Sequence, residues 1–318
     1  MSREPIGPPN ALVSPRFATS ATFARVPSTM EVKDPDIVVL GVPFDSGVSY
    51  RPGARFGPTS IRQGSKLLRP FNPALHTYPF SNVQVADDGD VGVNPFNIEE
   101  ALLQVESQAT CHVEKGRKLL TLGGDHTVAL ALLRTVSKKY GPVALVHFDA
   151  HLDTWDTYFG APYTHGTPFR RAFEENLLIR NSCYHVGTRG PLYAESDLLE
   201  DKGFGFEVIT SDEVANSGWR LCVDRIASGV GDSPLYVSID IDVLDPAFAP
   251  GTGTPEAGGL SSRELLQMVR ALREVNIVGA DIVEVAPAYD HAEITSIAAA
   301  HLGYELISLM SLNFKRQT

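Results

Sequence analysis

Two carboxylates and one imidazole follow an apolar run near the middle of the chain, at Asp149, His151 and Asp153. They end the segment 143–153, which begins as a continuous apolar run with β-branched character. That pattern is typical of a strand buried on both faces. Because alternate residues of an extended segment point to the same side, the three side chains are predicted to emerge together. Such a group could ligate a metal ion.

Two other apolar runs end in similar polar residues. The run 234–242 finishes with Asp240 and Asp242, before a loop rich in proline and glycine. The run 118–122 leads through a Gly-Gly-Asp turn to His126, and glycine in such a turn lets the backbone approach a ligand closely. In α/β sheets, sites lie at the carboxyl ends of the strands. These side chains are therefore predicted to converge with those of the first run.

Four of the converging groups are carboxylates, and their charges require compensation. Buried together they would repel one another, and some would have to bind protons. Two divalent cations balance four negative charges, and oxygen-rich ligation without a thiolate favours Mn²⁺ over Zn²⁺. A water that bridges two such ions loses a proton near neutral pH and becomes a nucleophile. The predicted metal ligands are His126, Asp149, His151, Asp153, Asp240 and Asp242.

Each motif taken alone also has a structural explanation. An Asp-x-Asp sequence at a strand end is more often a turn or cap than a pair of ligands, and a histidine after Gly-Gly-Asp can simply hydrogen-bond the backbone. The occurrence of all three motifs at strand ends of one chain favours a metal site over three unrelated turns.

The composition of the chain narrows the classes of function. The chain has 318 residues, a net charge of −11 and a pI near 5.3, which argue against nucleic acid or an anionic membrane as a partner. Hydrophobic residues make up 43% of the chain, enough for a full core, and no apolar run is long enough to span a bilayer. Three dispersed cysteines and the lack of a signal-peptide pattern predict free thiols and a cytoplasmic location.

Predicted strands and helices alternate along nearly the whole chain, which favours an α/β class with a mainly parallel sheet. Residues 1–34 are predicted to form an N-terminal arm, and residues 35–318 a single domain. The strands are predicted at 36–43, 83–90, 118–122, 143–153, 182–187, 205–209, 234–242 and 275–285. The helices are predicted at 59–67, 97–115, 128–139, 170–178, 219–228, 261–274 and 294–312, with a Ser261–Glu264 capping box at 261.

Three motifs together resemble the signatures of the ureohydrolases, the family of arginases, agmatinases and guanidino-acid hydrolases. They are Gly-Gly-Asp-His at 123–126, Asp-Ala-His-Leu-Asp at 149–153 and Ser-Ile-Asp-Ile-Asp-Val-Leu-Asp-Pro at 238–246. The likeness extends from about residue 16 to residue 312. It implies a three-layer α/β/α sandwich with an eight-stranded, mainly parallel sheet, two Mn²⁺ per subunit and a homo-oligomer, either a trimer or a hexamer.

The resemblance also implies how the ligands are shared between the two ions. One ion would be held by His126, Asp149, Asp153 and Asp240, and the other by Asp149, His151, Asp240 and Asp242. Asp149 and Asp240 would therefore bridge the ions.

The reaction that the resemblance implies is hydrolysis of a guanidinium C–N bond by a hydroxide that bridges the two Mn ions. Glu284 resembles the carboxylate that pairs with the substrate guanidinium, a contact that can be bidentate. His165 is similar to a family histidine that shuttles protons, a task that suits an imidazole. Asp153 would pass a proton to the leaving amine. The alternatives are a structural ion pair at Glu284 and a loop histidine bonded to the backbone at His165.

The predicted substrate is agmatine, which would give urea and putrescine, a polyamine. The segment 154–160 lacks the Asn and Ser side chains with which arginases hold an amino acid. Trp155 and Asp156 would face the distal ammonium of agmatine. Three features favour other substrates, namely guanidine, 4-guanidinobutyrate or 3-guanidinopropionate. The bulk of Trp155 could shorten the pocket, and Tyr158 stands at a position that varies among guanidino-acid hydrolases. Arg189 could pair with the carboxylate of a guanidino acid. A non-catalytic subunit with the same fold is a further alternative.

Overall fold

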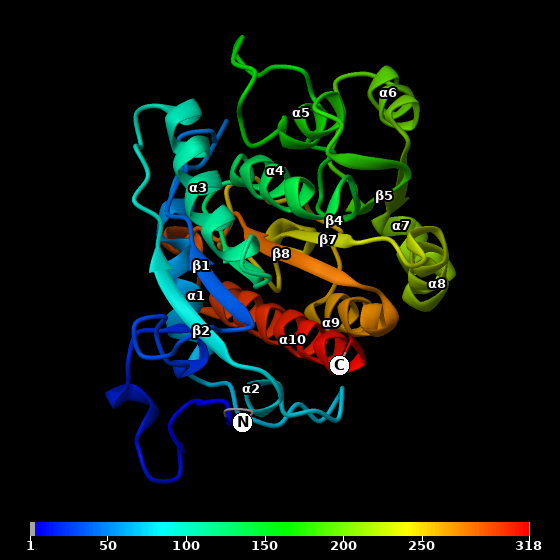
Figure 1. Ribbon diagram of the computed structural model, residues 1–318. Helices are drawn as coiled ribbons and strands as arrows, with labels where there is room; N and C mark the ends of the chain where they lie inside the picture. The colour runs from blue at the N-terminus through cyan, green and yellow to red at the C-terminus, as the bar shows by residue number, and fades with distance from the viewer. Residues whose placement is uncertain (1–3, 318) are drawn as a thin grey trace.

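The computed structural model describes residues 4–317 and contains one eight-stranded sheet (Figure 1). Its strands are β1 (Ile37–Gly41), β2 (Val85–Asp90), β3 (Lys118–Leu122), β4 (Val143–Phe148), β5 (Leu178–Thr188), β6 (Phe206–Thr210), β7 (Leu235–Asp240) and β8 (Ile277–Val283). They lie in the order β2-β1-β3-β8-β7-β4-β5-β6, and each neighbouring pair is parallel. The predicted α/β class with a parallel, eight-stranded sheet is confirmed.

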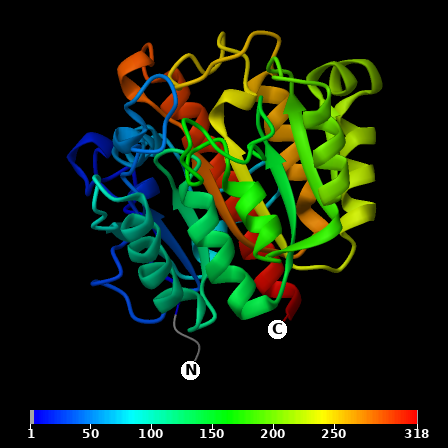
Figure 2. The same cartoon turned by 90° about the horizontal axis from the view of Figure 1, so that it is seen from above.

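Helices cover both faces of the sheet and complete three layers. They are α1 (Gly57–Ser65), α2 (Pro79–Asn82), α3 (Ile98–Val113), α4 (Val128–Tyr140), α5 (Pro168–Glu174), α6 (Ser196–Phe204), α7 (Ser211–Ser217), α8 (Trp219–Val230), α9 (Ser262–Ala271) and α10 (Ile294–Gln317). Helices α3, α4 and α5 pack on one face, whereas α1, α8, α9 and α10 pack on the other (Figures 1 and 2).

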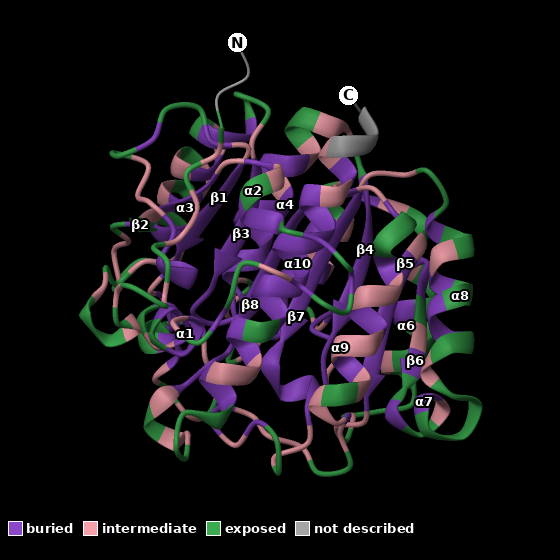
Figure 3. Ribbon diagram, turned by 90° about the horizontal axis from the view of Figure 1, so that it is seen from below, coloured by how far each residue is buried: buried purple, intermediate pink, exposed green. Residues whose placement is uncertain are grey.

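The central strands are apolar throughout because both of their faces are covered. Every residue of β3, β4, β7 and β8 is buried, as the purple ribbon in Figure 3 shows. Alternate residues face opposite layers: Leu119 and Leu145 belong to the hydrophobic cluster under α3 and α4, and Leu120 and Val146 to the cluster under α10. Such strands read as continuous apolar runs, which is why they could be predicted.

The strand predicted at 143–153 is too long. β4 ends at Phe148, and the polar residues 149–153 lie in the loop that follows it. The alternation of an extended strand therefore does not position these side chains. Asp153 has a φ of 55°, so the loop turns sharply and its own backbone geometry brings the side chains together.

Other boundaries differ because short elements carry weak signals. The strand predicted at 182–187 begins earlier as β5, since Leu178 already pairs with Val143. The helix predicted at 170–178 therefore ends as α5 at Glu174. The structure also contains α2, α6 and α7, none of which was predicted, and with four to nine residues they are too short for a clear helical period.

Part of the N-terminal segment packs onto the sheet. Phe23 is buried in the same hydrophobic cluster as β1 and β2, and its backbone N–H donates to Asp87 at 2.7 Å. Phe17 is exposed. The division into an arm at 1–34 and a single domain at 35–318 remains a prediction. Within residues 4–317, no helix combines the length and apolarity that crossing a bilayer requires.

Candidate metal centre

Polar residues that follow four neighbouring strands meet at one edge of the sheet. The strands β3, β8, β7 and β4 are adjacent in that order. His126 lies beyond the end of β3 and Glu284 follows β8. Asp240 ends β7 and Asp149 follows β4. Because parallel strands place their carboxyl ends together, the fold collects these groups from distant parts of the chain.

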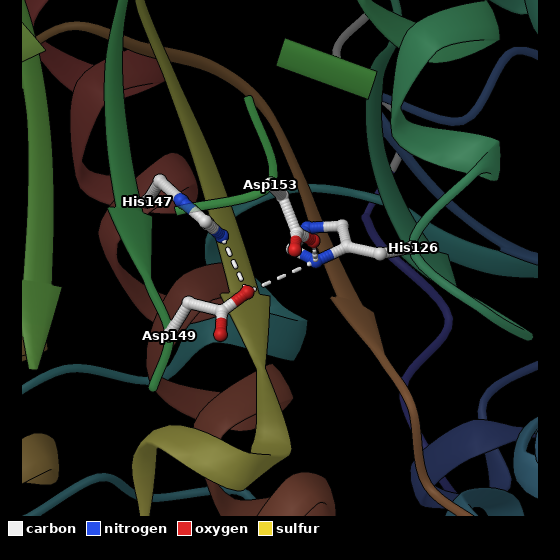
Figure 4. A group of neighbouring side chains, drawn as sticks. All are labelled: His126, His147, Asp149 and Asp153. Carbon is white, nitrogen blue, oxygen red and sulfur yellow. Dashed lines mark hydrogen bonds and ion pairs between the residues drawn. The ribbon is translucent and has the colours of Figure 1, made fainter. Parts of the chain in front are cut away.

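One group of candidate ligands surrounds Nδ1 of His126. This nitrogen lies 2.9 Å from Oδ2 of Asp153 and 3.2 Å from Oδ2 of Asp149 (Figure 4). Oδ2 of Asp240 is 3.4 Å away. The His126 side chain is fully buried, and within the described chain its Nδ1 has no hydrogen-bond partner. Buried, closely spaced carboxylates around an unpartnered nitrogen are costly unless a cation lies between them, so these four residues could hold one divalent ion.

Asp149 also faces a second group. Its Oδ1 lies 3.2 Å from Nδ1 of His151, whereas its Oδ2 faces His126. Nδ1 of His151 is in turn 3.3 Å from Oδ2 of Asp242. The two oxygens of Asp149 thus point to different groups, as a carboxylate that bridges two ions requires. Asp240 reaches the first group through Oδ2 while its Oδ1 accepts the N–H of Asp242, so bridging by Asp240 remains a prediction.

Burial and mutual repulsion perturb these carboxyl groups. Burial, with Asp242 and Asp149 nearby, holds the pKa of Asp240 well above its ordinary value. Burial and Asp149 raise the pKa of Asp242 to about 6. Asp149 behaves differently, because the surrounding histidines outweigh the effect of burial and lower its pKa. Bound cations would relieve the repulsion and keep all the aspartates ionised, which fits the donor set to a metal site.

A hydrogen-bond chain behind His126 selects the tautomer that a ligand needs. The hydroxyl of Ser238 on β7 donates to Oδ1 of Asp281 at 2.7 Å. The oxygen of Ser238 is 2.8 Å from Nε2 of His126 and must then accept its N–H. The proton therefore sits on Nε2, and the lone pair of Nδ1 is free for a cation. Ser238 and Asp281 are absent from the predicted set, although Ser238 precedes Asp240 by two residues on the same side of its strand.

His165 and Glu284 contact each other beside the first group. Nδ1 of His165 is 3.3 Å from Oε1 of Glu284, and that oxygen also accepts the backbone N–H of His126 at 2.9 Å. Nε2 of His165 is 2.7 Å from the hydroxyl of Ser49, which was not predicted. Burial alone would lower the pKa of His165, but Glu284 and Asp153 outweigh it and raise the pKa to about 9. The two residues predicted to handle substrate and protons therefore lie side by side next to the first group of candidate ligands, and their roles remain predictions.

Two predicted site residues have left-handed backbones, a conformation that non-glycine residues rarely adopt. The φ of Asp153 is 55° and that of Glu284 is 63°. Conformations of this kind are costly and gather at functional sites, where the surrounding structure holds them. Both carboxylates are thereby aimed at the same edge of the sheet.

An aromatic cluster adjoins His165. The ring centroids of Trp155 and Tyr158 are 5.7 Å apart, and those of Tyr158 and His165 are 6.3 Å apart. Tyr193, which was not predicted, lies 5.8 Å from Trp155 and 6.3 Å from Tyr158. The structure thus brings Trp155 and Tyr158 close to the catalytic candidates, where their rings could contact a substrate.

Asp156 and Arg189, two candidates for contacts with a substrate tail, have other partners. The side chain of Asp156 is 65% exposed and pairs with Arg171 at 2.5 Å. Arg189 donates to backbone carbonyl oxygens, including those of Asp242 and Glu256 at 2.7 Å each. Arg189 therefore joins loops around the site and does not present its guanidinium to a carboxylate.

His147 is a site residue missing from the predicted set. Its Nε2 lies 2.7 Å from Oδ2 of Asp149 (Figure 4), and its Nδ1 lies 2.7 Å from Nδ1 of His185. Burial lowers the pKa of His147 to about 3, so its imidazole is neutral. A signal was present in the sequence, because His147 precedes Asp149 by two residues at the end of the strand.

Known proteins share this fold and these motifs. A profile of the arginase family matches residues 35–308, which include every candidate ligand. Proclavaminate amidinohydrolase of Streptomyces clavuligerus is 43% identical over 295 residues, covering 93% of this chain and 94% of that protein. Its solved structure has a TM-score of 0.91 at 42% identity and covers 94% of this chain and 100% of that chain.

Two further relatives have names that point to other guanidino compounds. A putative agmatinase of Schizosaccharomyces pombe is 43% identical, covering 92% of this chain and 83% of that protein. A guanidinobutyrase of Pseudomonas aeruginosa is 42% identical, covering 93% of this chain and 94% of that protein. Family match, parallel sheet and clustered aspartates and histidines agree, and the chain belongs to the arginase family.

Proposed function

We propose that this protein hydrolyses the guanidinium C–N bond of a small guanidino compound and releases urea and an amine, with two Mn²⁺ as cofactors. The observation that carries the proposal is that Asp149 turns one oxygen toward His126 and the other toward His151. Two divalent ions bound there would lower the pKa of a water molecule and supply hydroxide near neutral pH. The cluster of four carboxylates and two imidazoles suits two ions better than one.

The residues of the chain would bind the substrate and move protons. Glu284 would accept hydrogen bonds from the guanidinium and fix its plane in front of the metal ligands. His165 holds a proton beside Glu284, 3.3 Å from its Oε1, and could exchange it with the reacting groups. Asp153, whose Oδ2 lies 2.9 Å from Nδ1 of His126, would deliver a proton to the departing amine.

Agmatine is the first candidate substrate. The rings of Trp155, Tyr158 and Tyr193 would attract the distal ammonium of agmatine through cation–π contacts. Asp156, which was predicted to assist, is exposed and bonded to Arg171, so the rings alone support this candidate. Urea and putrescine would be the products.

A 4-guanidinobutyrate or 3-guanidinopropionate substrate is the second candidate, and Arg51 favours it. Arg51 lies two residues after Ser49, which contacts His165. Its guanidinium is stacked 5.4 Å from the ring centroid of Tyr50 and 5.2 Å from that of Tyr289. A guanidinium placed near the site could pair with the carboxylate of a guanidino acid.

Urea release from a panel of compounds tests the proposal. The Mn²⁺-loaded protein would be assayed with agmatine, arginine, 4-guanidinobutyrate, 3-guanidinopropionate and guanidine, with chelator-treated protein as the control. Arg51→Met separates the two candidates, because it should impair turnover of guanidino acids and leave agmatine turnover unchanged. Urea from none of the compounds would contradict the proposal and favour a non-catalytic subunit. The trimer or hexamer and the cytoplasmic location remain further proposals.

A further inference from the structure

A buried row of polar side chains runs from Asp149 away from the metal centre. It passes from His147 on β4 to His185 on β5 and then to Asp201 on α6. His147 and His185 occupy paired positions of the two parallel strands, so their rings lie side by side. The side chains of all four residues are fully buried. Buried polar groups require partners, so each contact in this row matters to the fold.

The distances make the row continuous. Nε2 of His147 is 2.7 Å from Oδ2 of Asp149, and the Nδ1 atoms of His147 and His185 are 2.7 Å apart. Nε2 of His185 lies 3.2 Å from Oδ2 of Asp201, within ion-pair distance, although the contact does not have the geometry of a hydrogen bond. The row therefore links a candidate bridging ligand to an acid on the outer helix α6.

Thr154 connects the far end of the row, Asp201, to the loop that carries the candidate ligand Asp153. Its hydroxyl donates to the second oxygen of Asp201. Thr154 follows Asp153 directly, so the row begins behind one candidate ligand and ends beside another. Phe169 packs against His147, with ring centroids 4.2 Å apart, and shields the contacts from water.

Counting hydrogen atoms gives the row a direction. Of the two facing Nδ1 atoms, one must carry a hydrogen and the other must accept it. If His147 donated, its neutral ring would turn a bare Nε2 toward the oxygen of Asp149, and two lone pairs would face each other at 2.7 Å. If His185 donates, Nε2 of His147 carries its hydrogen and makes a charge-assisted hydrogen bond to Asp149. Nε2 of His185 then faces Oδ2 of Asp201 at 3.2 Å, which is the last contact of the row.

The spacing of atoms separates His147 from the metal ligands. Nδ1 of His126 has no hydrogen-bond partner in the described chain and stands 2.9–3.4 Å from three carboxylate oxygens. Two ligands of one ion with bonds of about 2.1 Å stand roughly 3 Å or more apart. His147 is closer than that to Asp149, and both of its nitrogens already have hydrogen-bond partners.

We propose that His147, His185 and Asp201 form a relay of positioning residues that holds the Asp149 carboxylate from behind, and that His147 is not a metal ligand. The relay fixes the orientation in which each oxygen of Asp149 meets one ion. Outer partners of this kind raise metal affinity without touching the metal. The inference rests on the proposed function for the presence of the ions, and it is independent of which guanidino compound is the substrate.

Mn²⁺ binding to metal-free protein tests the relay through two pairs of variants. His147→Phe and Asp201→Leu remove the polar contacts. His147→Gln keeps a side-chain N–H that can donate to Asp149, and Asp201→Asn keeps a side-chain oxygen that can accept from Thr154 and offers an N–H to Nε2 of His185. Calorimetric titration and Mn²⁺ spin-resonance spectra should show two ions per chain for all four variants at saturating Mn²⁺. The two disruptive variants should bind roughly 10- to 100-fold more weakly, and the two conservative ones should recover most of the affinity.

The control is His112→Gln. His112 is a buried histidine of helix α3, and its Nε2 lies 2.9 Å from Oδ2 of Asp88 on β2. This variant should bind Mn²⁺ as the wild type does. Loss of one whole ion from His147→Phe at saturating Mn²⁺ would overturn the relay, since His147 would then be a ligand. Wild-type affinity in both disruptive variants would also overturn it. Should His147→Phe fail to fold, the Asp201 pair decides alone, and a wild-type protein that binds no Mn²⁺ would instead refute the proposed function.

Discussion

Asp149 is the residue on which both groups of candidate ligands depend. Each of its oxygens faces a different histidine, and His147 and the backbone N–H of His151 also bond to it. The histidines around it keep its pKa low despite complete burial, so it would offer a negative charge to ions in both groups. An uncharged residue at this position would leave both groups incomplete.

Asp149→Ala should therefore abolish binding of both ions and not of one. Metal analysis after loading with Mn²⁺ and desalting would measure the stoichiometry. Asp156→Ala is the matched control, because Asp156 lies three residues beyond the Asp149–Asp153 motif and its side chain is 65% exposed, paired with Arg171. A variant at 149 that keeps two ions would refute the bridging assignment.

On the proposed function, Glu284→Gln should raise KM and lower kcat, because it removes the negative charge that would pair with the substrate guanidinium. A hydrogen bond to a charged group contributes about 1.5–3 kcal/mol, so kcat/KM should fall roughly 10- to 150-fold. Steady-state urea release measures both constants. Glu175→Gln is the control, since Glu175 bonds Arg134 on the outer surface. Unchanged kinetics in the Glu284 variant would contradict the proposal that Glu284 binds the substrate.

The candidate ligands could be proposed from the sequence because they stand at or just beyond the ends of apolar runs. His147 and Ser238 could not be found in that way, since they lie inside the runs and their partners come from other strands. Asp156 shows that proximity in the sequence is not enough to place a side chain. It is a close sequence neighbour of the ligands, but the loop turns its side chain toward Arg171, and only the three-dimensional path of the loop reveals this.

At the scale of elements, capping decides where helices start. The α9 helix begins with the predicted capping box, in which Ser261 and Glu264 each bond the other's backbone N–H. In contrast, the unpredicted α6 buries only Asp201 among its residues. Its hydrophobic pattern is therefore weak, and its place is set by contacts with the rest of the fold, among them the contact of Asp201 with His185.

Ser261→Ala should destabilise the protein by about 1 kcal/mol, the usual effect of losing an N-cap. Unfolding in urea, followed by circular dichroism, would show a lower midpoint with an unchanged slope. Ser262→Ala serves as the control, because Ser262 is the first helical residue and does not occupy the cap. Equal midpoints for the two variants would contradict the capping argument.

At the scale of the whole molecule, Lys118 is a charge placed inside the protein. Its side chain is buried on β3, its Nζ has no hydrogen-bond partner among the described residues, and the ammonium lies 5.1 Å from the ring centroid of Phe314. Burial lowers the pKa of Lys118 to about 8. The lysine of the unfolded chain has the higher pKa, so the unfolded chain binds more protons between about pH 8 and 10. Stability therefore rises with pH in that interval. The destabilisation by Lys118 is complete below pH 8 and falls as the pH rises above it.

Lys118→Met should therefore stabilise the protein by roughly 1–3 kcal/mol at pH 7, and the gain should shrink towards pH 10. Urea unfolding at several pH values measures the difference from the wild type. Lys138→Met is the control, since the Lys138 side chain is 65% exposed. A gain that does not change with pH would show that the charge of Lys118 is not the cause.

The placement of two metal ions is the claim on which the rest of the account depends. The most direct measurement is an anomalous difference map, at the manganese absorption edge, from crystals grown with Mn²⁺. We predict two peaks roughly 3.5 Å apart on either side of Asp149, one beside Nδ1 of His126 and the other beside Nδ1 of His151. A single peak, or peaks remote from Asp149, would contradict the account.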